Sequence, residues 1–128
     1  MRDAHYRAVH TNGSEDAVDT TQLLKGVLDL AVLAVLDGED GYGYDVVRRL
    51  RAAGLDEVGD ASVYGTLRRL YSAGHLTSYV VPSAEGPHRK YYGLNVSGRA
   101  QLEISTKTWH GFADTMAALL TDEAEVAS

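Results

Sequence analysis

The stretch DASVYGTLRRLYSAG, residues 60–74, decides the fold of this chain. Its apolar side chains recur at i, i+1, i+4, i+7 and i+8, the spacing of one helical face: Val63, Tyr64, Leu67, Leu70 and Tyr71. Gly59 or Asp60 can cap the start of this helix, and Gly74 can end it. The opposite face carries small polar side chains and arginines: Ser62, Gly65, Thr66, Arg69 and, at its edge, Arg68.

Two helices are expected before this stretch. From about residue 22 to 36, apolar side chains cover nearly every face, so this helix should be buried on all sides and should need a partner beyond one small domain. Residues 37–41 are acidic or glycine and break the pattern. A second helix is predicted from about residue 44 to 53, ended by Gly54.

A β-hairpin is expected after the stretch. Residues 77–81, TSYVV, are typical of a strand, and Pro82 should stop it. Residues 83–87 are rich in turn formers, and residues 90–94, KYYGL, form the returning strand. The hairpin bears a cationic shoulder made by His88, Arg89 and Lys90. Helix, turn, helix and hairpin in this order indicate a winged helix-turn-helix.

The last predicted helix begins at Asn95 or Ser97 and runs to about Leu120. Its apolar side chains recur at the a and d positions of a heptad and form a seam that should pack against a partner helix. The seam residues are Leu102, Trp109, Phe112, Met116 and Leu119. The predicted fold is therefore mainly α with a small β-hairpin. A flexible arm (1–20) precedes a winged helix-turn-helix domain (21–94), a C-terminal dimerisation helix (95–121) and an acidic tail (122–128).

Charge is distributed unevenly along the chain. The net charge of the whole sequence is −6, which argues against a nucleic-acid partner. Between Arg48 and Lys107, however, nine Lys and Arg face five Asp and Glu, a local charge of +4. Because cations collect on the predicted helix and hairpin, DNA is the partner that the sequence favours.

Several fragments resemble the PadR family of transcriptional regulators, in the short form with a single C-terminal helix. They occur in order at 24–29 (LKGVLD), 41–45 (GYGYD), 62–70 (SVYGTLRRL), 73–76 (AGHL) and 89–94 (RKYYGL), followed by Gly98, Trp109 and Phe112. The chain departs from the family pattern at Gly65, where proline is usual, and at Asn95, where threonine is usual.

The resemblance implies a two-fold dimer formed by the last helix, which packs partly on the first helix of the other subunit. It also implies repression through a near-palindromic operator, with release by a small aromatic ligand. Such a ligand would bind at the dimer centre, beside Trp109, Phe112 and Met116. These three residues are otherwise interpreted as packing residues of the seam.

Roles for the basic and polar side chains follow from DNA chemistry. Ser62, Thr66 and Arg69 are expected to face the bases, with Arg69 as the main reader because a guanidinium pairs bidentately with guanine. Arg68, Arg89 and Lys90, together with His88, are expected at the phosphates. The resemblance assigns a phosphate contact to the Tyr64 hydroxyl as well, although its place on the apolar stripe also fits burial.

Other functions are less well supported by the sequence. No nucleophile–base pattern, metal-ligand spacing or cofactor motif is found, so no enzyme, metal or cofactor is predicted. The chain has no cysteine and no apolar run long enough for a membrane span, and a cytoplasmic location is expected. Two alternatives stay open: a winged-helix module that binds protein and not DNA, and a winged-helix regulator of another family, such as a MarR-like one.

Overall fold

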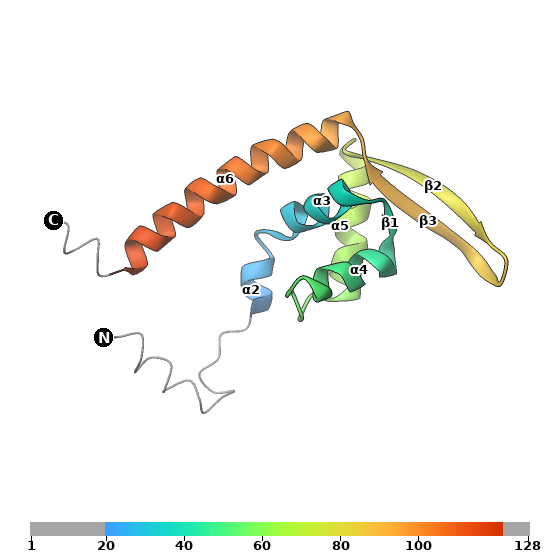
Figure 1. Ribbon diagram of the computed structural model, residues 1–128, viewed down its shortest axis with the longest axis horizontal. Coiled ribbons are helices and arrows are strands. Elements are labelled where there is room, and N and C mark those ends of the chain that lie inside the picture. Colours follow the sequence, from blue (N-terminus) through green and yellow to red (C-terminus); the bar gives the residue numbers. More distant parts are fainter. Residues whose placement is uncertain (1–19, 122–128) are drawn as a thin grey trace, which may run out of the picture.

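The computed structural model describes residues 20–121. Five helices and three strands make up this part of the chain: α2 (Thr20–Leu24), α3 (Leu28–Gly38), β1 (Gly41–Tyr42), α4 (Gly43–Ala52), α5 (Asp60–Ser72), β2 (Leu76–Ser83), β3 (Gly86–Leu94) and α6 (Val96–Leu120). The predicted arm, apart from Thr20, and the predicted tail lie outside the described residues. Helices α3, α4 and α5 form the centre, and the β2–β3 hairpin and α6 project from it in opposite directions (Figure 1). The expected class, mainly helical with a small antiparallel sheet and a long last helix, is confirmed.

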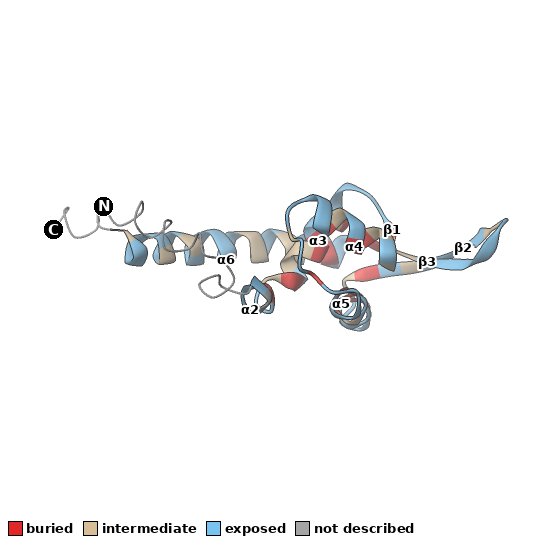
Figure 2. Cartoon of the chain, turned by 90° about the horizontal axis from the view of Figure 1, so that it is seen from below, coloured by how far each residue is buried: buried red, intermediate tan, exposed pale blue. Residues whose placement is uncertain are grey.

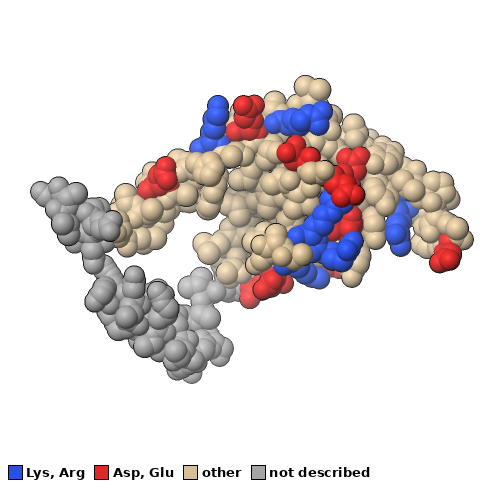
Figure 3. All heavy atoms as spheres, viewed as in Figure 1, with Lys and Arg blue, Asp and Glu red and all other residues tan. Residues whose placement is uncertain are grey.

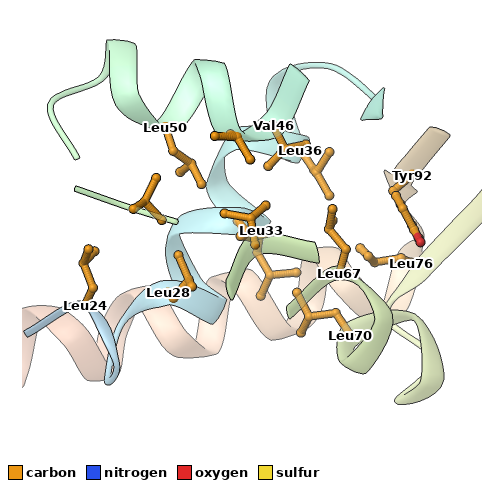
Figure 4. Packing of buried hydrophobic residues seen from close by; sticks show 14 residues of the cluster. Leu24, Leu28, Leu33, Leu36, Val46, Leu50, Leu67, Leu70, Leu76 and Tyr92 are labelled. Carbon is orange, nitrogen blue, oxygen red and sulfur yellow. The ribbon is translucent and has the colours of Figure 1, made fainter. Parts of the chain in front are cut away.

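One apolar core lies between the three central helices and the sheet (Figure 4). Each helix contributes side chains that are almost fully buried, and each such side chain stabilises the fold by roughly 1.5–3 kcal/mol. They are Val32, Leu33, Val46, Val47, Leu50, Val63 and Leu67. Leu76 of β2 and Tyr92 of β3 close the core on the side of the sheet.

The prediction of one continuous helix from about residue 22 to 36 is wrong, because the structure has two helices there. The chain turns at residues 25–27, where Val27 N–H donates to Leu24 C=O, and this turn separates α2 from α3. Glycine is a poor helix residue, and Gly26 stands within the turn. The turn lets Leu24 and Leu28 both reach the core. Burial on all sides was expected to need a partner, and within the single chain Leu23 remains 66% exposed.

The sheet differs from the predicted hairpin in two ways. Pro82 lies inside β2, at a register irregularity between Val81 and Ser83. Proline is tolerated at such a bulge because no ladder hydrogen bond needs its missing N–H. A third strand, β1, pairs antiparallel with β3 through Gly41 opposite Tyr92 and gives the order β1-β3-β2. The hairpin is therefore longer than predicted and is anchored at its base by β1.

The boundaries of the other helices agree with the sequence analysis. Gly54 and Gly74, which follow α4 and α5, have φ angles of 118° and 88°, in the left-handed region that favours glycine. Asn95 caps α6 through its side chain, which accepts a hydrogen bond from Gly98 N–H. Most of α6 extends beyond the buried centre, and its side chains there are exposed or half-buried (Figure 2).

Candidate nucleic-acid interface

One face of helix α5 packs into the hydrophobic core, and the opposite face is exposed to solvent. Val63, Leu67 and Leu70 are buried, so the helix cannot rotate without breaking the core. Ser62 and Arg68 are exposed, as predicted. Thr66 requires a correction, because its side chain is only 3% exposed and lies on the core side. From that position the Thr66 side chain does not face solvent and is not available to DNA.

A cleft separates α5 from the base of the hairpin. Its walls are formed by Tyr42, Gly43, Tyr44, Tyr64, Leu67, Arg68, Arg89, Lys90 and Tyr92. Tyr64 packs against the start of α4, where a Cβ on Gly43 would lie 2.5 Å from the Tyr64 Cε1 atom. Its ring is therefore neither in the core nor free, and 37% of the residue stays exposed beside the cleft. Arg68 thus faces the same space as the two cations of the hairpin.

Aromatic rings hold these two cations in place. The Arg89 guanidinium lies 4.6 Å from the centroid of the Tyr42 ring. The Lys90 ammonium lies 5.6 Å from the Tyr71 ring and 5.7 Å from the Tyr92 ring. Such cation–π contacts contribute about 0.5–1 kcal/mol at exposed sites and restrict the side chain. His88 is exposed one residue before Arg89, nearer to the tip of the hairpin.

Arg69 is directed to the other side of α5. Its guanidinium forms an ion pair with Asp29 of α3, and both side chains remain more than half exposed. Together with His75 and Gln101 they line a second hollow between α3, α5 and α6. The two neighbouring arginines therefore face different surfaces, and only Arg68 shares the cleft with the hairpin.

The local charge of +4 overstates the positive field near the cleft. Asp45 of α4 forms ion pairs with both Arg48 and Arg49, and Arg51 pairs with Asp60 at 3.0 Å. Basic and acidic side chains are interspersed over the visible face of the helices (Figure 3). Within residues 20–121, by contrast, Arg68, Arg89 and Lys90 form no ion pair. Lys25, Arg99 and Lys107 are likewise unpaired within these residues, but they lie away from the cleft.

Sequence reasoning missed the tyrosines that support the hairpin. The Tyr79 ring stacks on Tyr91 with centroids 5.7 Å apart, and Tyr91 contacts Tyr42 at 5.4 Å. The Tyr79 hydroxyl donates a 2.6 Å hydrogen bond to Asp40 Oδ2. This bond to a carboxylate, with lesser contributions from desolvation and nearby negative charge, raises the pKa of Tyr79. The glycine–tyrosine repeat at 41–44 was a signal for Tyr42 alone, because Tyr79 and Tyr91 lie outside it.

The predicted seam lies along α6. Leu102 packs against the core, whereas Phe112 and Leu119 are 58% and 72% exposed. Met116 is half-buried, and Trp109 is exposed with its ring 6.3 Å from that of Phe112. An aromatic and aliphatic face is therefore uncovered in the single chain.

Metal-binding clusters and membrane-spanning helices are both absent from residues 20–121. No group of three or more His, Cys, Asp or Glu side chains is close enough to hold a metal ion there. None of the helices in the same range is long and apolar enough to cross a membrane.

Three helices packed around a hydrophobic core, with a hairpin beside the third, define a winged helix-turn-helix protein. The model of the PadR-like family of transcriptional regulators matches residues 32–104, so the chain belongs to this family. The family consists of regulators and not of enzymes, which confirms the prediction that this chain is not an enzyme.

Solved structures agree with this assignment. A PadR-like regulator from Bacillus cereus is 33% identical, covers 78% of this chain and 97% of its own, and superposes with a TM-score of 0.69. A PadR family regulator from Eggerthella lenta is 29% identical over 91% of this chain and 96% of its own, with a TM-score of 0.72. Bacillus subtilis PadR, solved in complex with operator DNA, shares the fold at 23% identity and a TM-score of 0.57, over 62% of this chain and 46% of its own.

Proposed function

We propose that this chain is a homodimeric DNA-binding regulator that inserts α5 into the major groove and lays the β2–β3 wing along the phosphates. The observation that carries the proposal is the cleft in which Arg68 of α5 faces Arg89 and Lys90 of the wing. The complex of Bacillus subtilis PadR with operator DNA supports a DNA partner for a protein of this fold.

The proposed DNA contacts are assigned from the exposure of each side chain and from its ion pairs. Arg68, Arg89 and Lys90 are the main cations, with Tyr64 beside them at the cleft and His88 exposed one residue before Arg89. Ser62 is exposed on the side of α5 that carries Arg69, so any contact it makes lies outside the cleft. Cations without acidic partners can neutralise phosphates at no cost in broken ion pairs. Arg69 would first have to leave Asp29, so we assign it a smaller contribution than Arg68.

The dimer is proposed from the uncovered face of α6. Trp109, Phe112, Met116 and Leu119 follow a heptad spacing on a helix of 25 residues, which is about 37 Å long. Such a face in water is normally buried by a partner helix, as in two-stranded bundles. Two-fold pairing through it would present two α5 helices to a near-palindromic operator in the cytoplasm.

We further propose that the protein represses transcription and is released by a small aromatic compound that binds beside Trp109, Phe112 and Met116. Trp109 is the only tryptophan of the chain, so quenching of its fluorescence reports on this position alone. A panel of planar aromatic compounds should include some that quench Trp109 and lower DNA affinity. A panel without any response would remove the effector from the proposal.

Selection from a pool of random DNA tests the function. The wild-type protein should enrich a dyad whose half-sites are centred about one helical turn, 10–10.5 base pairs, apart. Arg68→Ala should lose most of this enrichment. The alternative, a protein-binding module, is favoured by the net charge of −6, and it predicts no enrichment with either protein.

A further inference from the structure

The turn that follows α5 is tied directly to the first turn of α6. Asn95 Oδ1 accepts a 2.8 Å hydrogen bond from Gly98 N–H, and its Nδ2 donates a 2.9 Å bond to Gly74 C=O. The two partners fix the orientation of the amide, since one offers only a donor and the other only an acceptor. Asn95 therefore caps α6 and joins it to the turn that ends α5.

A close backbone approach reinforces this joint. A Cβ on Gly98 would lie 2.1 Å from the backbone oxygen of His75, and Gly98 is buried. Because the obstructing atom belongs to the backbone, a side chain at position 98 requires α6 to move away from the turn. The His75 Nδ1 atom also lies within hydrogen-bond distance, 2.8 Å, of Ser97 Oγ.

We propose that Asn95 and Gly98 are positioning residues that set the separation of the two α5 helices in the dimer, and with it the preferred half-site spacing in DNA. The inference rests on the proposed function, in which α6 carries the two-fold axis and α5 carries the DNA contacts. Neither residue lines the cleft or belongs to the seam of α6. Their effect on DNA is exerted only through the angle between these helices.

The length of α6 makes this angle important. The seam residues from Trp109 to Met116 lie 11–18 residues beyond Gly98, which corresponds to about 17–27 Å along the helix. A tilt of about 10° over a lever of about 20 Å displaces the DNA-binding part by about 3.5 Å, which is about one base-pair step. A small change at the joint is therefore enough to change the register of the two half-sites.

Three variants separate a role of Asn95 and Gly98 in positioning α6 from a role in stability alone. Asn95→Asp keeps an equally good helix cap, because Asp and Asn are similar at this position, but it replaces the donor to Gly74 C=O by an acceptor. Gly98→Ala adds a methyl group against the His75 oxygen. Gly111→Ala makes the same change further along α6, where no atom lies within 4 Å of the new Cβ, and serves as the matched control.

The chain has no cysteine, so one spin label can be placed on each copy through Ala61→Cys, an exposed position in the first turn of α5. Pulsed electron paramagnetic resonance then measures the separation of the two α5 helices without DNA. Asn95→Asp and Gly98→Ala should shift this distance by about 2 Å or more, or broaden its distribution. Gly111→Ala should leave it unchanged, and all variants should keep the mass of a dimer.

DNA selection with the same variants completes the test. The joint variants should prefer a half-site spacing that differs by about one base pair from that of the wild type. An unchanged distance in a folded dimer of Asn95→Asp overturns the inference, even if Gly98→Ala fails to fold. Failure of the wild type to bind DNA refutes the proposed function alone, since the α5–α5 distance still tests the joint, whereas a monomeric wild type overturns both.

Discussion

Arg69 of α5 forms an ion pair with Asp29 of α3, although the two residues are 40 positions apart in the sequence. The pair directs Arg69 toward α3 and α6, whereas its neighbour Arg68 lines the cleft beside the wing. Consecutive residues of a helix differ by about 100° in direction, so two adjacent arginines cannot serve the same surface equally. This division of roles is the basis of the first prediction.

Arg68→Ala should weaken DNA binding more than Arg69→Ala. Loss of one direct contact costs about 1–3 kcal/mol, which corresponds to roughly fivefold to 150-fold in affinity, and the proposed dimer loses one contact at each half-site. Thr66→Val should leave the affinity unchanged, because the Thr66 side chain is buried. Fluorescence anisotropy on the selected DNA measures all three variants. Equal losses for Arg69→Ala and Arg68→Ala would show that Arg69 leaves Asp29 and reads the DNA.

Gly93→Ala should destabilise the base of the wing. A Cβ at this position would lie 2.3 Å from Asp40 Oδ1, so the carboxylate must move and its bond to Tyr79 breaks. Overpacking of this kind costs roughly 1–3 kcal/mol in the free energy of unfolding. The matched change Gly111→Ala meets no atom and should stabilise α6 by up to about 1 kcal/mol. Urea denaturation measures the free energy of unfolding of both variants. A Gly93→Ala protein as stable as the wild type would contradict the close packing of Gly93 against Asp40.

Tyr79→Phe should change the pH dependence of stability. The bond to Asp40 raises the pKa of Tyr79 above its usual value of about 10, so the folded state favours the neutral phenol. Its contribution to stability is therefore complete below about pH 10 and is lost as the pH rises through the pKa of the folded state. The stability difference between wild type and Tyr79→Phe should be constant from pH 7 to 9 and should shrink above about pH 10.

The control for this experiment is Tyr44→Phe, which removes another exposed hydroxyl near the cleft. This variant measures the effect of losing a tyrosine hydroxyl without touching the bond between Tyr79 and Asp40. A Tyr79→Phe difference that is independent of pH up to 11 would mean that the hydrogen bond to Asp40 contributes nothing to folding.

Phe112→Asp should convert the proposed dimer into a monomer. A carboxylate on the seam would be buried against the partner helix without a compensating charge. His110→Asp places the same side chain two residues earlier, off the predicted seam, and should leave the mass unchanged. Light scattering at several concentrations gives the mass, and an unchanged Phe112→Asp dimer would exclude this face of α6 as the interface.

The helical part of the fold could be predicted because its signals are local. Gly54 and Gly74 end their helices by a backbone conformation that other residues rarely adopt, and Asn95 caps α6 by its own side chain. The break between α2 and α3 was missed because an uninterrupted apolar pattern hid the turn at Gly26. Strand β1, only two residues long, depends on β3, which is about 50 residues away in the sequence.

The site could be predicted only in part, and Thr66 explains why. The buried face of α5 follows positions 63, 66, 67 and 70, whereas the aromatic residues at 64 and 71 suggested a stripe turned by one position. Both sets fit a helical period, and the choice depends on tertiary packing. Likewise, the pairing of Arg69 with Asp29 is a contact between distant segments that no spacing in the sequence reveals.

The salt dependence of DNA binding tests the central proposal most directly. Affinity for the selected DNA should fall steeply and linearly with the logarithm of salt concentration. Arg68→Ala or Arg89→Ala should each reduce the slope by about 2, because each substitution removes one cation from both copies of the dimer. Lys107→Ala, an exposed cation of α6 outside the cleft, should leave the slope unchanged. A slope that is the same in the wild type and both cleft variants would contradict the proposal that the cations at this cleft contact the DNA phosphates.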